Sequence, residues 1–401
     1  MIRPARVPIT GPVAPYAEGF CTHLAEQGYS SVAAGNHRRL LAHLSRWMAD
    51  AGLGAAELTP LAAQQFLRRR RREGYATKLS VRGLAPLLSY LDSLGVLPNL
   101  DNVSPSPTGL LLQAYCEYLR RERGLVDGSV RLYEGVARLF LSERSEALRE
   151  DLASLSGADI SAFILRESSR CGAAGAKTAV CGLRSLLRFL CLEGWIPHQL
   201  SAAVPAVAGR RLNSLPRALD PTQVALMLES CDRYTVVGRR DFAILTVLAR
   251  LGLRAQEVAA LELDDVDWRA GEVVVRGKGP RLERLPLPSD VGEAVADHLR
   301  QGGPRGSCRR LFLCSAAPVR GISRSAVTSV VHRACKRAGV PPVGAHRLRH
   351  TVATELLRRG ASLPEIGQVL RHKSLMTTAI YARVDRVNLS TLALPWPGSE
   401  S

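Results

Sequence analysis

Apolar residues recur every three or four positions through most of the first two hundred residues. The spacing is clear in residues 37–52 (HRRLLAHLSRWMADAG) and in residues 81–98 (VRGLAPLLSYLDSLGVLP). This period puts apolar side chains on one face of a helix, so both stretches are predicted to be amphipathic helices. Gly95 and Pro98 end the second stretch in the order that helix C-termini commonly use.

Part of this helical half occurs twice. Residues 87–98 (LLSYLDSLGVLP) align with residues 186–197 (LLRFLCLEGWIP) at an offset of 99. Residues 20–29 align with residues 115–125 at a slightly shorter offset. An offset near one hundred is too long for a solenoid unit, so the pattern predicts a duplicated small domain. We therefore expect two bundles of four or five helices.

The second half has a mixed pattern. Residues 222–231 and 241–254 predict helices, the first with Thr222 as its N-cap. Three consecutive valines and the turn Gly277-Lys278-Gly279 predict a β-hairpin within residues 268–288. Two more helices are expected near the C-terminus, over residues 345–360 and 362–374. The predicted fold is mainly α with a small β-sheet.

Pro-rich and Ser-rich stretches set the domain boundaries. We predict a weakly ordered arm (1–15), a first helical domain (16–98), a second helical domain (110–200), an α+β domain (215–385) and an apolar tail (386–401).

The net charge of the chain indicates which class of partner it binds. The formal net charge is +18 and the isoelectric point is about 10.1, with arginines spread along all 401 residues. A distributed cationic surface suits the phosphate backbone of double-stranded DNA, although a generally basic proteome gives the same balance.

The cysteines and apolar runs indicate a location. Nine cysteines contain no C-x-x-C pair, and the spacing of Cys308, Cys314, His332 and Cys335 matches no common zinc pattern. Scattered cysteines are typical of a reducing cytoplasm. The first residues lack the apolar region of a signal peptide, and no run approaches a membrane span. We expect a cytoplasmic, nucleoid-associated protein with no membrane contact and no metal site.

Candidate chemistry is concentrated in residues 344–384. This stretch contains His346, Arg349, His372 and Tyr381, and Arg254 lies far upstream in the segment LGLRAQEVAAL. Two cations, two imidazoles and one phenol suit attack by a tyrosine on a phosphodiester, because the developing phosphoryl charge needs donors around it. A phenol with an ordinary pKa near 10 must also lose its proton, so neighbouring cations are expected to favour the phenolate.

The ordered set resembles the catalytic domain of the tyrosine recombinases, the integrases of the phage and Xer type. That family has an Arg, a Lys on a β-hairpin, His-x-x-Arg, a His or Trp, and a Tyr. All six occur here in order, and the resemblance covers roughly residues 215 to 385. The residues are Arg254, Lys278, His346, Arg349, His372 and Tyr381.

The resemblance implies a role for each residue. Tyr381 would be the nucleophile and would form a 3′-phosphotyrosyl link. Lys278 would protonate the leaving 5′ oxygen, and His346 would accept the tyrosine proton or bind the phosphoryl group. The cations and His372 would stabilise the pentavalent state, with Glu257 holding Arg254. No cofactor, metal ion or ATP would be needed.

This sequence departs from the family at one point near the site. The family usually has Gly directly before the histidine of the last motif, whereas Arg371 precedes His372 here. We expect the local turn around His372 to be altered.

The resemblance also implies how DNA is held. Each helical domain resembles the family's core-binding domain, and the second copy is the better candidate for that role. Four protomers would act on two duplexes, with or without a partner recombinase, and the tail would pack on its own domain or on a neighbouring protomer. Two sets of residues are predicted to contact DNA. They are Arg68, Arg69, Arg70, Arg71 and Arg72 in the first copy, and Lys177, Thr178, Arg184 and Arg188 in the second.

The leading hypothesis is a site-specific recombinase of a mobile element. The same chemistry used once would relax DNA, as a type IB topoisomerase does. A protein with a vestigial site would bind DNA without cleaving it, and the complete set of six residues argues against that alternative.

Overall fold

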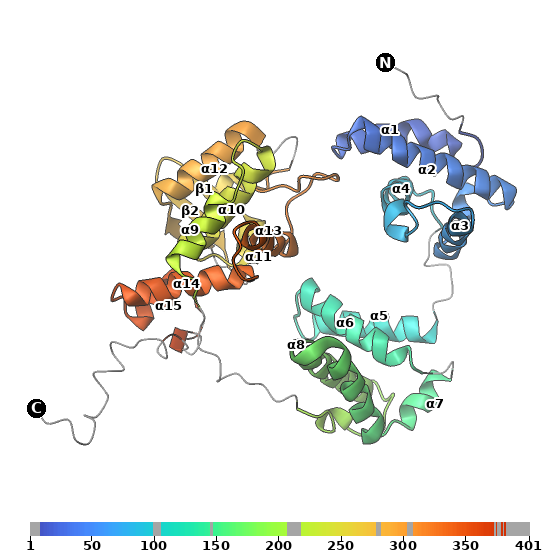
Figure 1. The fold of residues 1–401 in the computed structure, drawn as a ribbon. Coiled ribbons are helices and arrows are strands. Elements are labelled where there is room, and N and C mark those ends of the chain that lie inside the picture. Colours follow the sequence, from blue (N-terminus) through green and yellow to red (C-terminus); the bar gives the residue numbers. More distant parts are fainter. Residues whose placement is uncertain are drawn as a thin grey trace, which may run out of the picture. The chain divides into compact units, whose positions relative to one another are not determined.

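The computed structural model describes residues 9–98, 106–144, 147–206, 218–277, 282–302, 308–372, 374, 378–379 and 381 (Figure 1). Its contacts divide the chain into two compact units, Met1–Pro98 with Leu212–Ser401, and Asn99–Arg211. The described residues are mostly helical, with one three-stranded antiparallel sheet, so the predicted fold class is confirmed. Lys278 and the tail 386–401 lie outside the described residues.

The N-terminal helical segment contains α1 (Ala17–Glu26), α2 (Ser31–Asp50), α3 (Pro60–Arg72) and α4 (Val81–Ser93), with short 3-10 turns at Ala14–Tyr16 and Ala55–Glu57. Side-chain oxygens cap two of these helices, because Ser30 accepts from the Ala33 N–H and Thr59 from the Ala62 N–H. The apolar faces meet in a core made only of residues from this segment, including Phe20, Leu41, Phe66 and Leu87.

The second unit contains α5 (Pro107–Arg121), α6 (Asp127–Leu141), α7 (Leu148–Ala153), α8 (Gly157–Leu192) and a 3-10 turn at Leu200–Ala202. The long α8 is broken at Gly172, whose φ of 65° lies in the left-handed region. It therefore consists of two helices with a kink between them. This unit also has its own core, which includes Tyr115, Phe140 and Phe163.

The sequence repeat extends to the way its helices end. At an offset of 99, Gly95 and Gly194 follow α4 and α8 with φ of 66° and 67°. The Val96 N–H donates to the Leu91 carbonyl at 3.0 Å, and the Trp195 N–H donates to the Leu190 carbonyl at 2.8 Å. Both leucines are fully buried. The two aligned stretches thus share the same left-handed helix ending and the same buried anchor.

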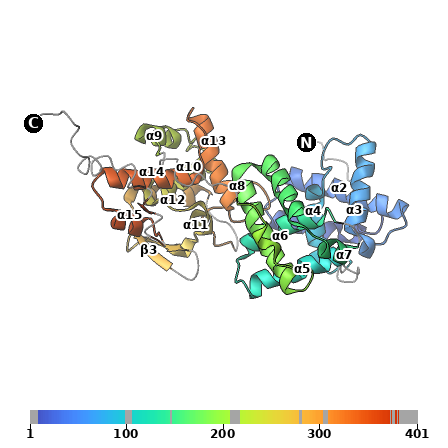
Figure 2. The same cartoon turned by 90° about the horizontal axis from the view of Figure 1, so that it is seen from below.

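The C-terminal segment surrounds α10 (Val236–Leu251), which packs against α12 (Ser289–Gly302) and α14 (Ala345–Arg358). The sheet consists of β1 (Val266–Asp267), β2 (Glu272–Arg276) and β3 (Leu282–Pro286), in that order. Figure 1 labels β1 and β2, and Figure 2 labels β3. In the predicted hairpin, Val274 of β2 pairs with Arg284 of β3. The remaining elements are α9 (Pro221–Glu229), α11 (Ala255–Ala260), a 3-10 turn at Leu263–Asp265, α13 (Arg324–Arg337) and α15 (Leu363–Val369).

Two boundary predictions need correction. Thr222 is not the N-cap of its helix, because Asp220 occupies that position and accepts from the Thr222 N–H at 2.9 Å. Pro221 is thus the first helical residue, where its missing N–H costs nothing. The last helix also ends at Val369, earlier than the predicted residue 374. His372 therefore lies in a turn after the helix.

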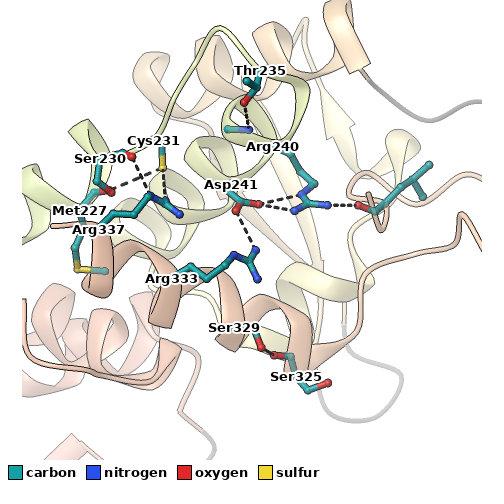
Figure 3. A network of polar contacts seen from close by, with 12 residues as sticks. Met227, Ser230, Cys231, Thr235, Arg240, Asp241, Ser325, Ser329, Arg333 and Arg337 are labelled. Atoms are coloured by element: carbon teal, nitrogen blue, oxygen red, sulfur yellow. Dashed lines mark hydrogen bonds and ion pairs between the residues drawn. The ribbon is translucent and has the colours of Figure 1, made fainter. Parts of the chain in front are cut away.

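A buried ionic network holds α10 to α13 (Figure 3). The Asp241 carboxylate is 2% exposed and accepts from Arg240 at 2.6 Å and from Arg333 at 3.0 Å. Arg240 also donates to the Leu313 carbonyl at 2.9 Å. Each buried charge therefore has an ionic partner, which offsets part of its desolvation cost.

Asp241→Asn is expected to lower stability by about 3 kcal/mol, because it leaves the two arginine side chains without their shared carboxylate. A lower calorimetric transition temperature of the full chain would show the loss. Asp290→Asn is the matched control, since the exposed Arg250–Asp290 pair is worth at most about 1 kcal/mol. Equal effects of the two substitutions would contradict this account of the network.

Candidate active site

Arg254 lies at the corner between α10 and α11, as predicted. Gly252 ends α10 with a φ of 59°, which favours glycine. A Cβ at this position would also lie only 2.9 Å from Leu370 Cδ2, so the space at the corner favours glycine as well. Arg254 Nη1 donates to Glu257 Oε1 at 2.6 Å, and the Arg254 backbone N–H donates to Oε2 at 2.8 Å. The Arg254 side chain remains 39% exposed. Glu257 therefore fixes an arginine that still faces solvent.

Arg349 lies one helix away on α14 and is 1% exposed. Its Nη1 donates to the Gly252 carbonyl at 2.7 Å, and its Nη2 donates to the Leu370 carbonyl. Burial and the Arg254 charge lower the pKa of Arg349 to about 10. This guanidinium thus joins the α10–α11 corner to the turn after α15, and it is held where positive charge is already in excess.

Two histidines share the exposed side of α14. His346 is exposed, and its ring lies 4.4 Å from the His350 ring, centroid to centroid. His350 Nδ1 lies 2.7 Å from the Tyr381 hydroxyl, within hydrogen-bond distance. His350 and not His346 therefore contacts the phenol. Sequence reasoning missed this role, although the spacing of the two histidines on one helix face was visible.

Tyr381 is buried in this structure, with 1% of its surface exposed. It packs with Ala353, Ile366 and Leu370 in a small apolar cluster. Burial raises the pKa of Tyr381 to about 12, and the opposing effect of the Arg349 charge is smaller. The expectation that neighbouring cations would favour the phenolate is therefore wrong for this conformation, because desolvation dominates.

His372 follows α15 and faces the segment that carries Tyr381. Its Nδ1 lies 2.8 Å from the Thr378 hydroxyl, and its ring is parallel to the Tyr381 ring at 6.5 Å. Arg371, directly before it, adopts a φ of 56°, in the left-handed region. The structure thus brings together five of the six catalytic candidates, and Lys278 lies outside the described residues.

The histidines of the site are held neutral. Burial, followed by the charges of Arg349 and Arg254, lowers the pKa of His372 to about 4. Burial, followed by His346, Arg347 and Arg349, lowers the pKa of His350 to about 4. Burial and nearby arginines also lower the pKa of His346. The site therefore holds cations and neutral imidazoles, a combination that favours binding an anion.

These shifts predict a pH dependence of stability. The folded chain binds protons at His350 and His372 only near pH 4, whereas unfolded histidines bind them near pH 6.5. Between these values the unfolded state holds more protons, so stability should fall as the pH is lowered from about 6.5 to about 4. The double variant His350→Gln/His372→Gln should show a shallower fall in calorimetric transition temperature, and exposed His332→Gln should not. Parallel curves would contradict the assignment.

The arginine run of α3 does not form one solvent-facing patch. Arg70 is 6% exposed and lies 4.0 Å from the Tyr75 ring centroid, so the expectation that all five arginines face DNA needs correction. Arg69 is paired with Asp50 and Glu73. A run of five consecutive residues covers every side of a helix, and one of those sides faces the core.

The predicted DNA-contacting residues of α8 lie along one side of its second half. Lys177 and Arg188 are exposed, while Arg184 is half-buried and donates to the Val204 carbonyl at 2.8 Å. Thr178 lies beside them and is also half-buried. In the first copy, the positions offset by 99 from the two arginines are Ala85 and Ser89. The two copies therefore present different charge on equivalent helices.

Two further searches concern only the described residues. None of these helices is long and apolar enough to cross a membrane. No group of three or more His, Cys, Asp or Glu side chains in the described part of the chain is placed to hold a metal ion.

Comparison with known sequences identifies the family. Residues 217–387 match the model of the phage integrase family. The protein y4rA of Sinorhizobium fredii (strain NBRC 101917 / NGR234), named as an integrase/recombinase, is 42% identical over 98% of this chain and 96% of that protein. The tyrosine recombinase XerD of Mycobacterium tuberculosis (strain ATCC 25618 / H37Rv) is 31% identical over 72% of this chain and 97% of XerD. The chain belongs to the phage integrase family of tyrosine recombinases, which confirms the resemblance.

Solved structures support the fold. The XerH site-specific recombinase bound to palindromic difH substrate is similar with a TM-score of 0.55, at 20% identity over 83% of this chain and 94% of that one. The Tn1549 transposon integrase in complex with a circular intermediate DNA gives a TM-score of 0.53, at 18% identity over 71% and 99% of the two chains.

Proposed function

We propose that the chain is a site-specific DNA recombinase that cleaves and rejoins strands through a 3′-phosphotyrosine at Tyr381. One observation carries the proposal most directly. Arg254, Arg349 and His346 all act electrostatically on His372, whose ring is parallel to the Tyr381 ring at 6.5 Å, although these residues come from three separate stretches of the chain. Such a cluster can stabilise the charge of a pentavalent phosphoryl group.

The reaction balances without an added reagent. The Tyr381 oxygen forms a bond to phosphorus, the bond to the 5′ oxygen breaks, and Lys278 supplies the proton that this oxygen takes. The phenol proton passes to His350 Nδ1, which lies 2.7 Å away. The family resemblance gives this task to His346, whose ring lies 4.4 Å from the His350 ring, centroid to centroid. A 5′-hydroxyl of a second strand then reverses the steps and releases the tyrosine.

The described conformation has to open before this chemistry. Tyr381 and Arg349 are each 1% exposed, so a phosphodiester reaches them only after the Tyr381 segment moves. Arg254 and His346 are already accessible and provide the first contacts. An incoming phosphate adds negative charge beside the arginines, and this raises the low pKa of the histidines.

The partners follow from charge and from the relatives. Double-stranded DNA is the substrate, and the exposed Lys177 and Arg188 of α8 provide phosphate contacts. The similarity to a transposon integrase favours a mobile element as the setting. We further propose that four protomers assemble on two DNA sites, with or without a partner recombinase, in the cytoplasm and on the nucleoid.

A suicide substrate tests the proposal. A duplex nicked beside the cleavage point lets the released fragment diffuse away, so a covalent protein–DNA adduct accumulates on a denaturing gel. We expect this adduct to form at the same rate in excess EDTA, because the six catalytic candidates contain no carboxylate pair for Mg²⁺. Loss of cleavage in EDTA that Mg²⁺ restores would point to a two-metal nuclease. Relaxation of any plasmid by a monomer would favour a topoisomerase.

A further inference from the structure

The turn from Leu370 to His372 contains an unusual backbone conformation. Arg371 has a φ of 56°, in the left-handed region that L side chains rarely adopt and that glycine adopts without strain. Glycine would thus fit this turn at a lower conformational cost. An arginine in this strained conformation indicates that its side chain has a functional role.

The Arg371 side chain is directed inwards and is 3% exposed. Its Nη2 donates to Glu257 Oε2 at 2.8 Å, and its Nη1 donates to the Val369 carbonyl at 3.3 Å. Its Nε lies 3.7 Å from Glu283 Oε2 on β3, the strand that lies beside α15 in Figure 2. One guanidinium therefore contacts α11, the end of α15 and the sheet.

The backbone of the same turn binds both arginines of the site. The Leu370 carbonyl accepts from Arg349, and the Arg371 carbonyl accepts from Arg254 Nη2 at 3.4 Å. Glu257 Oε1 accepts from the Arg254 guanidinium, while Oε2 accepts from both the Arg254 backbone N–H and the Arg371 guanidinium. The turn and Glu257 thus form a closed set of contacts around Arg254.

We propose that Arg371 is a positioning residue for strand cleavage. It fixes Glu257, so that the Arg254 guanidinium is aimed at the phosphate, and it joins β3 to the turn that carries His372. A glycine would supply the backbone conformation and neither of these contacts. The proposal rests on the proposed recombinase function, because its effect is on the cleavage step.

The charges around Glu257 predict how the loss of Arg371 would change the pH dependence of cleavage. Burial raises the pKa of Glu257, but the Arg254 N–H and the charges of Arg371 and Arg254 outweigh it, so the net shift is downward. Arg349 also lies within electrostatic reach of Glu257, and Glu283 faces Arg371. Loss of the Arg371 charge therefore raises the pKa of Glu257. The acid limb of the cleavage profile should then move to higher pH, because Glu257 must be ionised to hold Arg254.

The test compares Arg371→Gly with wild type and with Arg359→Ala, a control at an exposed arginine. Glycine keeps the turn, so DNA affinity should be retained. Single-turnover cleavage of the nicked substrate should fall roughly tenfold to a hundredfold, as for a misplaced catalytic group. The acid limb should move upward, and Arg371→Gly should have little further effect in a Glu257→Gln background. A merely structural role would not move the acid limb.

Stabilisation by orthovanadate, read as a shift in transition temperature, is a second measurement. If orthovanadate stabilises wild type but not Arg371→Gly, the positioning role of Arg371 is supported. This conclusion holds even if wild type forms no covalent adduct, because the missing adduct would contradict only the proposed recombinase function. If Arg371→Gly does not fold, Arg371→Lys is the variant that tests the proposal. A single ammonium group cannot make all the contacts of the guanidinium, so cleavage by Arg371→Lys should still fall. Cleavage within twofold of wild type by the folded glycine variant, or failing that by the lysine variant, would overturn the proposal.

Discussion

Tyr381→Phe is expected to abolish the covalent protein–DNA adduct while leaving duplex binding unchanged. The substitution removes only the nucleophilic oxygen, and the ring still fills the apolar cluster around Ile366 and Leu370. The lost hydrogen bond to His350 should cost about 1 kcal/mol of stability, too little to unfold the chain. The nicked suicide duplex on a denaturing gel gives the adduct, and a gel shift gives the affinity.

Tyr234→Phe is the matched control, because Tyr234 is 96% exposed and lies in the turn just before α10. It should form the adduct at the wild-type rate. If Tyr381→Phe also forms an adduct, another side chain is the nucleophile, and the mechanism proposed above fails at its first step.

The sequence predicted the helices and the hairpin that carry the candidate residues because the signals for these elements are local. Gly252 ends one helix, and the residues after it start another, so the corner at Arg254 follows from helix-ending rules. The helix predicted over residues 345–360 is α14, which carries both His346 and Arg349. The valines of β2 predicted the hairpin in the same way.

The sequence did not predict which of these residues are buried. Arg349 and Tyr381 are enclosed, and Arg70 lies under Tyr75, because residues distant in sequence pack over them. The contact of His350 with Tyr381 joins residues 31 positions apart, and no periodicity encodes it. The ion pair between Arg371 and Glu257 spans 114 positions. Tertiary packing decides these properties, and with them the pKa of each group.

Arg349→Gln is expected to reduce single-turnover cleavage by about a thousandfold or more, because one charged fork of the phosphate site is removed. Its effect on stability should be small by comparison. The charge is disfavoured in the DNA-free state, where burial and Arg254 hold the pKa of Arg349 at about 10, a cost of about 3 kcal/mol. Arg349→Gln removes this cost, but it also removes the hydrogen bonds to the Gly252 and Leu370 carbonyls, which are worth roughly 1.5–3 kcal/mol each.

Orthovanadate separates the two contributions. Wild type should gain transition temperature with this phosphate analogue, since the anion neutralises Arg349 and Arg254 together, and Arg349→Gln should gain much less. Arg349→Lys keeps the charge without the fork and should cleave far more slowly than wild type while remaining folded. If Arg349→Gln cleaves within tenfold of wild type, Arg349 only joins α14 to its neighbours. The catalytic charge then comes from Arg254 alone.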